Sequence, residues 1–285
     1  SRPLSYTAIS AYAECPYRFS MERVLGLGTS TRRTLSPTGL QTPYAASDEG
    51  GTTPSAREER TARGATVHAL LEWSQANGWA EPSEQLAHRH ALAAGLDPER
   101  IDAAALLAPV RGWLGSPLRE RIDAGAARVR AEVPILLGVG DTVLRGSVDL
   151  LVEREGEPPL VIDYKTDRLK GSEPAERAAG YETQRTIYAL AVAESLGVSE
   201  VEVAYVFLER PEEPALSVLD QAEMELGRER LATAIARIGR GEFPVAPVEK
   251  RDWALCRGCP ALRGLCSGPQ EGSADESSFA ASSSS

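Results

Sequence analysis

Residues 142–166 read TVLRGSVDLLVEREGEPPLVIDYKT, and this stretch decides the fold class. Its apolar residues alternate or run together over 142–154 and again over 159–164, with a turn signal from Gly156 to Pro159 between them. A further run of this kind covers residues 128–138. Apolar runs separated by turns that contain Gly and Pro are typical of adjacent antiparallel strands, so the sequence predicts a three-strand meander.

Helical periodicity is found on both sides of the meander. Ser5 is the expected N-cap of the first helix, and Pro16 suits the first position of a second helical turn. A fourth strand is predicted at 200–208, where polar and apolar residues alternate. The predicted helices cover residues 4–25, 58–79, 81–95, 98–114, 174–196 and 220–240.

The order of these elements predicts an α/β fold: a helix, the three-strand meander, a helix and a strand, with a helical insertion at 80–125. One domain is expected over residues 1–266. Within it, residues 26–56 are rich in Gly, Ser, Thr and Pro and lack periodicity, which predicts a long mobile loop. Residues 267–285 end in four serines and are expected to form a disordered tail.

The composition excludes several classes of protein. The chain has 285 residues, of which 42% are hydrophobic and 25% are charged, an ordinary balance for a globular protein. It contains no apolar run of the roughly 18 residues that a transmembrane helix needs, so no membrane partner is expected. No signal peptide leads the sequence, and a cytoplasmic location is expected. Because residue 1 is Ser, we interpret the chain as a piece cut from a longer protein.

The net charge of −10 argues, taken alone, against a nucleic-acid binder. The acidity is local, however. Residues 191–225 carry nine acidic side chains and one basic side chain, and the tail at 267–285 adds three acids, so the rest of the chain sums to +1. Lysine is also scarce: Lys165, Lys170 and Lys250 stand against 28 arginines. A lysine retained in such a chain suggests a role that needs a compact, titratable charge.

Two carboxylates and one of these lysines lie at the ends of the predicted strands. If the strands are adjacent and antiparallel, Asp149 and Asp163 can approach each other, and alternation places Asp163 and Lys165 on one face. This charge set is costly unless a hard cation such as Mg²⁺ compensates it. The lysine could then orient a metal-bound water or stabilise charge on a phosphate oxygen. The alternative is a solvated strand end that carries an ion pair.

Two helical pairs accompany the carboxylates. His68 and Glu72 are four residues apart on one predicted helix, and Gln184 and Tyr188 are four apart on another, so each pair shares a helical face. The alternatives are a core histidine for the first pair and ordinary helix packing for the second.

Together these motifs resemble the PD-(D/E)XK nuclease superfamily, and specifically its RecB-like nuclease domains. The matching segments are VHALLE at 67–72, GSVDLL at 146–151, DYKT at 163–166 and QRTIY at 184–188, in the order found in the family. The resemblance covers nearly the whole chain. It implies a restriction-endonuclease-like core and metal-dependent hydrolysis of phosphodiester bonds.

The resemblance also implies roles for individual residues. Lys165 matches the position that assists the nucleophilic water. Gln184 and Tyr188 match a motif that shapes the site and holds the DNA strand, and Glu72 matches a position that supports the histidine. The positions that match ligands of Mg²⁺ or Mn²⁺ are His68, Asp149, Asp163 and, through its backbone carbonyl, Tyr164.

The four cysteines form a second candidate site, with one near the N-terminus and three near the C-terminus. They are Cys15, Cys256, Cys259 and Cys266. A disulfide framework is not expected in a reducing compartment, so four thiolates suit either Zn²⁺ or an iron–sulfur cluster.

The segments AYAECPYRF at 11–19 and CRGCPALRGLC at 256–266 resemble those of RecB-like nucleases, including AddB-type domains, that bind a [4Fe–4S] cluster. Such a cluster would staple the two ends of the domain together. The last spacing here is six residues, where the subset most often has five. The flanking bases would give a basic patch for phosphates, or simply a solvated loop; they are Arg18, Arg23, Arg251, Arg257 and Arg263.

The leading hypothesis is therefore a nuclease that cuts single-stranded DNA in repair or recombination. The sequence has no phosphate-binding loop of an ATPase, so we expect a helicase motor in cis or in trans to deliver the strand. Two alternatives are a stand-alone nuclease of the CRISPR-adaptation type and a non-catalytic iron–sulfur module that binds DNA.

Overall fold

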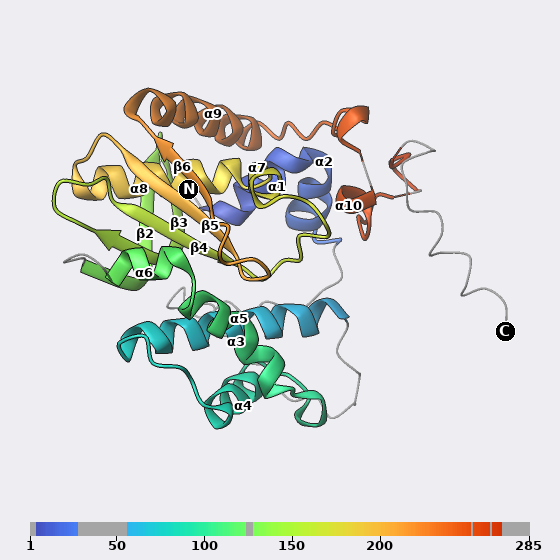
Figure 1. The fold of residues 1–285 in the computed structure, drawn as a ribbon. Helices are drawn as coiled ribbons and strands as arrows, with labels where there is room; N and C mark the ends of the chain where they lie inside the picture. The colour runs from blue at the N-terminus through green and yellow to red at the C-terminus, as the bar shows by residue number, and fades with distance from the viewer. Residues whose placement is uncertain (1–3, 28–55, 124–127, 252, 263, 270–285) are drawn as a thin grey trace, which may run out of the picture. The chain divides into compact units, whose positions relative to one another are not determined.

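The computed structural model describes residues 4–27, 56–123, 128–251, 253–262 and 264–269 (Figure 1). The predicted loop and tail lie almost wholly outside these residues, as does Arg263. The chain divides into two compact units. We call residues 35–137 and 145–226 the sheet unit, and residues 1–34, 138–144 and 227–285 the cysteine unit. None of the helices within the described residues is both long and apolar enough to span a membrane.

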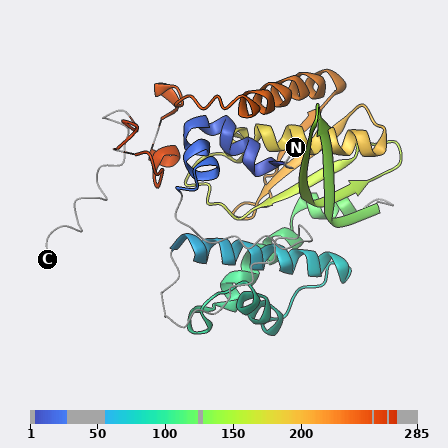
Figure 2. The same cartoon turned by 180° about the vertical axis from the view of Figure 1, so that it is seen from behind.

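The predicted meander is present. Its strands are β2 (Arg128–Val139), β3 (Thr142–Glu153) and β4 (Leu160–Lys165), each within one residue of the predicted bounds. Figure 2 shows the long β2–β3 hairpin from behind. β3 and β4 pair in antiparallel register, with Leu150 opposite Ile162. The antiparallel arrangement that brings the two strand ends together is thus confirmed.

The predicted fourth strand is β5 (Val201–Phe207), and it pairs with β4 in parallel. Parallel strands need a crossover connection, which α7 (Pro174–Ala179) and α8 (Glu182–Leu196) provide. α8 packs against β5 (Figure 1). The strand order is β1-β3-β4-β5-β6, with β2 also paired to β3, so the fold is mixed α/β with a mixed sheet.

In this crossover region one prediction was wrong and one strand was missed. The single helix expected at 174–196 is broken at Gly180, which ends α7, and at Tyr181, which has non-helical dihedral angles. A further strand, β6 (Ala215–Leu219), was not predicted, because five residues within the acidic segment give too short an alternation. β6 is a strand because β5 pairs with it, a tertiary contact that local pattern does not reveal.

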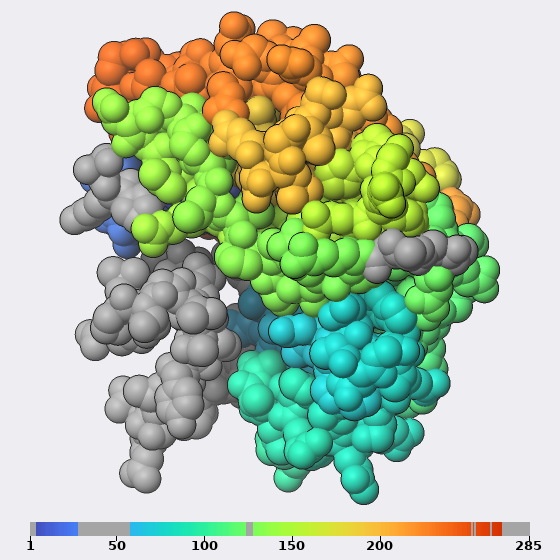
Figure 3. Space-filling view, turned by 90° about the vertical axis from the view of Figure 1, so that its left-hand side faces the viewer, coloured from blue at the N-terminus to red at the C-terminus, as the bar shows by residue number. Residues whose placement is uncertain are grey.

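The helical insertion packs with the helix before it around a shared core. Trp113, Leu70 and Leu107 are fully buried there. Figure 3 shows these helices closely packed, in blue-green and green. The expected helix at 98–114 is instead a 3₁₀ turn at Pro98–Arg100 followed by a helix that Asp102 caps, accepting a hydrogen bond from the Ala105 amide at 3.0 Å. The helices are α3 (Ala56–Ala76), α4 (Glu84–Ala93), α5 (Ala103–Leu114) and α6 (Pro117–Asp123).

The cysteine unit begins with the helical segment predicted at 4–25, which is divided at Cys15 so that a second helix starts at Pro16, as predicted. Ser5 caps the first by accepting a hydrogen bond from the Ala8 amide at 3.2 Å, as predicted. Cys15 is extended, with φ of −152°, so the helix ends there and Pro16 starts the next one. Tyr12 and Phe19 pack edge to face, with ring centroids 5.6 Å apart.

The remaining elements of this unit are mostly short. The predicted helix at 220–240 is α9, of which residues 227 onward belong to the unit. The elements are β1 (Leu4–Ser5), α1 (Tyr6–Glu14), α2 (Pro16–Phe19), the π-helical turn η1 (Ser20–Val24), α9 (Gln221–Gly239), the 3₁₀ turn η3 (Val248–Lys250) and α10 (Trp253–Cys256).

Candidate active site

The centre of the candidate site lies where β3 and β4 separate. Continuing their register by one residue beyond Leu150 and Ile162 places Asp149 opposite Asp163. Here the Asp149 carboxylate accepts a hydrogen bond from the backbone amide of Tyr164 at 2.6 Å. In a regular sheet a backbone carbonyl would accept the hydrogen bond of the Tyr164 amide, but here the Asp149 side chain accepts it. This bond holds Asp149 against β4.

His68 and Glu132 complete a group of potential metal ligands around Asp149. The His68 ring, on α3, lies with Nδ1 3.2 Å from Asp149 Oδ1. Ligand atoms of His68, Glu132 and Asp149 all lie within 4.8 Å of one another. Imidazole nitrogen and carboxylate oxygen are common ligands of divalent metals, so this group could hold one. Within the described part of the chain, this group contains Glu132, which the sequence did not predict, together with the predicted His68 and Asp149.

Sequence reasoning missed Glu132 because of its backbone conformation. It lies in β2, where the pattern predicts regular alternation, but its φ of +46° is in the left-handed region. A residue with this φ breaks the alternation, so the strand pattern does not indicate where the side chain points. Pro134 was an available signal, because proline inside a strand often marks an irregular or edge position.

The electrostatics of this group indicate an excess of negative charge. Burial opposes protonation of the His68 imidazole, but its hydrogen bond to Asp149 and the charges of the neighbouring carboxylates raise its pKa overall. Burial also raises the pKa of Glu132, and the charges of Asp149 and Glu72 raise it further. The site therefore attracts positive charge, which a bound proton or a divalent cation can supply.

Asp163 belongs to a separate hydrogen-bonded network that includes the lysine. Its carboxylate pairs with Lys165 Nζ at 2.6 Å and accepts hydrogen bonds from Tyr188 Oη at 2.8 Å and Gln184 Nε2 at 3.2 Å. Lys165 also donates to Gln184 Oε1 at 2.8 Å. Burial raises the pKa of Asp163 and Asp149 adds to this, whereas Lys165 and Tyr188 favour the charged form.

The structure therefore brings the predicted helical pairs to the strand ends. Gln184 and Tyr188 are buried and fix the Asp163 carboxylate, so they do more than pack the helix. Glu72 is exposed one turn after His68 and acts on the site through its charge. Gly64 allows the close approach of α3, because a Cβ at this position would lie 3.1 Å from Thr166 Oγ1.

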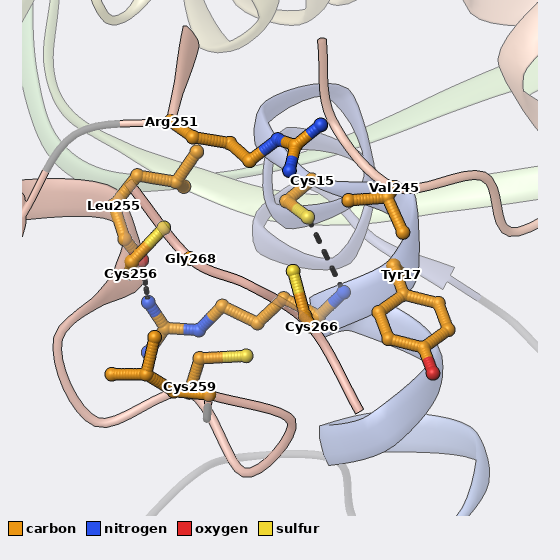
Figure 4. Close-up of a pocket in the computed structure, with 11 residues that line it drawn as sticks. Cys15, Tyr17, Val245, Arg251, Leu255, Cys256, Cys259, Cys266 and Gly268 are labelled. Atoms are coloured by element: carbon orange, nitrogen blue, oxygen red, sulfur yellow. Dashed lines mark hydrogen bonds between the residues drawn. The ribbon is translucent and has the colours of Figure 1, made fainter. Parts of the chain in front are cut away.

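The four cysteines all belong to the cysteine unit and line one pocket (Figure 4). Cys15 Sγ accepts a hydrogen bond from the backbone amide of Arg18 at 3.4 Å. The Arg18 side chain also lines the pocket, and it donates to the Leu255 carbonyl and pairs with Glu22 at 2.8 Å. Cysteines that are far apart in the sequence thus meet at one place. The rest of the lining is mostly apolar and includes Val245, Leu255 and Leu262.

Comparison with known families decides the identity of the chain. The family model of the PD-(D/E)XK nuclease superfamily matches residues 3–266 of this chain. The chain belongs to the PD-(D/E)XK nuclease superfamily. An ATP-dependent helicase/nuclease subunit from Pelotomaculum thermopropionicum is 34% identical over 130 residues, which cover 41% of this chain. The match spans only 10% of the length of that relative.

A crystal structure of a "Putative exonuclease" from Eubacterium rectale is also similar, with a TM-score of 0.47 and 14% identity. That match covers 93% of this chain and 89% of the other. Membership of the PD-(D/E)XK superfamily places the chain among nucleases, enzymes that hydrolyse phosphodiester bonds. Nucleases of this superfamily typically use divalent metal ions, and the group around Asp149 is a possible metal site.

Proposed function

We propose that the chain is a Mg²⁺- or Mn²⁺-dependent deoxyribonuclease with a restriction-endonuclease-like core that digests single-stranded DNA as an exonuclease. The observation that carries the proposal is the position of Asp149 and Asp163 on neighbouring strands, next to the pair Leu150 and Ile162 at which the β3–β4 pairing ends. Asp149 joins the possible metal ligands, and Asp163 holds Lys165. The same part of the sheet thus presents both a group of potential metal ligands and an ammonium group.

The donor set fits a hard divalent cation. His68, Glu132 and Asp149 supply one imidazole and two carboxylates, and partial burial together with the charge of Asp149 raises the pKa of Glu132. Asp163 and the carbonyl of Tyr164 are further candidates from the neighbouring strand. A divalent cation bound here would neutralise charge on the scissile phosphate and lower the pKa of a coordinated water.

The protein's own contribution is to place an ammonium group beside that phosphate. Asp163 and Gln184 hold the Lys165 ammonium, whose positive charge would then act on the attacking water or on a phosphate oxygen. Tyr188 and Gln184 fix Asp163 and so keep the lysine from rotating away. Gln184 and Tyr188 are largely buried, which supports a role in shaping the site before any role in holding the DNA strand.

We further propose that Cys15, Cys256, Cys259 and Cys266 bind a [4Fe–4S] cluster that joins the N-terminal and C-terminal segments. The four cysteines line one pocket, and the segments around them resemble those of RecB-like nucleases that bind such a cluster. Zn²⁺ is the alternative, because four thiolates also suit a tetrahedral Cys₄ site. Such a cluster would supply a covalent clip at a site with an apolar lining.

The relationship to a helicase/nuclease subunit supports a proposal for the biological setting of the chain. Its name includes both a helicase and a nuclease, and the matched part is one tenth of its length. We therefore propose that this nuclease works in cytoplasmic DNA repair or recombination beside a helicase motor, in cis or in trans, that feeds it a single strand.

A cleavage assay tests the activity. We expect the full chain to shorten end-labelled single-stranded DNA in Mg²⁺ or Mn²⁺, and a chelator to stop the reaction. Labels at the 5′ and the 3′ end separate exonucleolytic from internal cutting. Asp163→Ala is the inactive control. If the wild type binds DNA but does not cut it in either metal, the chain is a non-catalytic DNA-binding module.

Metal binding tests the part played by Glu132. We expect Glu132→Gln to weaken Mn²⁺ binding to the DNA-free chain by at least ~10-fold, since loss of even an outer-shell group commonly costs this much. Calorimetric titration gives the affinity. Glu155→Gln, in the exposed turn before β4, is the matched control. Equal affinities for the two variants would remove Glu132 from the metal site.

A further inference from the structure

Besides Asp163 and Gln184, an aromatic ring lies against the ammonium group of Lys165. Its Nζ lies 4.1 Å from the ring centroid of Tyr181 and 5.2 Å from that of Tyr205. Both distances are within the range in which a ring face attracts a cation. Asp163 and Gln184 bind the same ammonium group from other directions. The ammonium of this flexible side chain is thus confined by two acceptors and a ring.

Tyr181 is itself fixed on several sides. Its hydroxyl donates to the carboxylate of Asp167, and its backbone carbonyl accepts a hydrogen bond from Tyr205 Oη at 3.1 Å. Its ring packs on Tyr205 and Phe207, with centroids 5.3 and 6.4 Å away. These contacts give Tyr181 one orientation, so its ring can act as a rigid surface for the lysine.

The break between α7 and α8 places this residue. Tyr181 precedes the first residue of α8 and has φ of −106° and ψ of 17°, outside the helical region. If the helix were continuous through residue 181, helical geometry would set the direction of the Tyr181 side chain relative to that of Gln184. The break releases it from this restriction. The unexpected interruption of the predicted helix therefore coincides with the residue that covers Lys165.

We propose that Tyr181 is a positioning residue that holds the Lys165 ammonium for hydrolysis. This rests on the proposed function, in which Lys165 assists the reaction. The aromatic face is the required feature, because a ring restricts the rotamers of the lysine on the side where neither Asp163 nor Gln184 binds it. The hydroxyl has a lesser part: it anchors the ring to Asp167. Phenylalanine should therefore replace Tyr181 much better than leucine does.

Kinetics of the full chain distinguish positioning from general structural support. We expect Tyr181→Leu to lower kcat for single-stranded DNA by roughly 10- to 100-fold, the scale of an ångström-sized misplacement of a reacting group. KM should change little, because the residue acts through Lys165 and not on the DNA. Tyr181→Phe should retain most of kcat. Equal loss in both variants, or an unchanged kcat in Tyr181→Leu, would overturn the proposal.

An NMR experiment reads the contact without any cleavage. The chain has only three lysines, so ¹³C-lysine labelling of the full chain gives three ε-CH₂ signals. Lys165→Arg identifies one of them. The ring current of Tyr181 should move the Lys165 signal upfield of those from Lys170 and Lys250. Tyr181→Leu should remove most of this shift, leaving the part that is due to the more distant Tyr205 ring, and Tyr181→Phe should keep it.

The two readouts separate the possible failures. An absent ring-current shift in a wild type that cuts DNA overturns the positioning role and leaves the proposed function standing. If the wild type shows the ring-current shift but does not cut DNA, the proposed function is overturned. The contact between Tyr181 and Lys165 then has no role in catalysis. If Tyr181→Leu does not fold, Tyr181→Phe and Asp167→Asn still test the idea. Both should preserve the shift, and loss of the shift in either would contradict a ring held chiefly by packing.

Discussion

We expect Lys165→Ala to reduce DNA cleavage by roughly 10²- to 10⁴-fold, the range for removing a group that assists proton transfer or charge stabilisation. Lys165 is nearly buried, and its ammonium is bound by Asp163 and Gln184 beside the possible metal ligands. In the variant, the attacking water or the phosphate loses its cationic partner. Arginine should not substitute fully, because its planar fork cannot occupy the space of a compact ammonium group.

A matched control is available in the same segment. Lys170 is exposed in the loop that follows β4, so Lys170→Ala removes the same charge five residues further on without touching Asp163. Its cleavage rate should stay close to that of the wild type. Thermal unfolding of both variants shows whether Asp163, left buried without its cation, has destabilised the fold. A folded Lys165→Ala protein that cuts DNA at the wild-type rate would contradict the role of the lysine.

The parts of the site that lie on regular elements were predictable from the sequence. Alternation in residues 128–165 was sufficient to predict the meander, and antiparallel pairing then placed Asp149 near Asp163. Spacing of four residues on α8 was sufficient to place Gln184 and Tyr188 on one face, and both contact Asp163. Strand alternation, helical spacing and the pairing of consecutive strands depend on residues that are close in the sequence. A single sequence is therefore enough to predict them.

The parts that depend on irregular backbone were not predictable. Glu132 joins His68 and Asp149 only because its φ is positive, and alternation assumes extended geometry throughout a strand. Tyr181 reaches Lys165 from a break that helical periodicity alone did not place. In both cases the deviation from regular structure coincides with the candidate site. Tertiary contacts, which local propensity does not include, stabilise such deviations.

The second large effect is expected at the cysteines. Purified without oxygen, the full chain should be brown and should contain iron and sulfide, and Cys15→Ser should lose both. Ligand binding to a structural metal site contributes on the order of 10 kcal/mol to folding, so its loss should lower the thermal midpoint by more than ~10 °C. The cysteine unit should be especially sensitive, because its described helices from Tyr6 to Val24 and at Trp253–Cys256 are short.

The neighbouring loop offers a control for this experiment. Leu265 precedes Cys266 and is 66% exposed, so Leu265→Ala changes the same loop without removing a ligand. It should keep its iron and its thermal midpoint. Zinc found in place of iron would mean that the four cysteines still join the two chain segments, but through a single zinc ion. A stable, metal-free protein in which all four thiols react freely would refute the proposed link. Because Cys15 lies more than two hundred residues before Cys256, loss of either should free both chain segments, and the two single variants should unfold at similar temperatures.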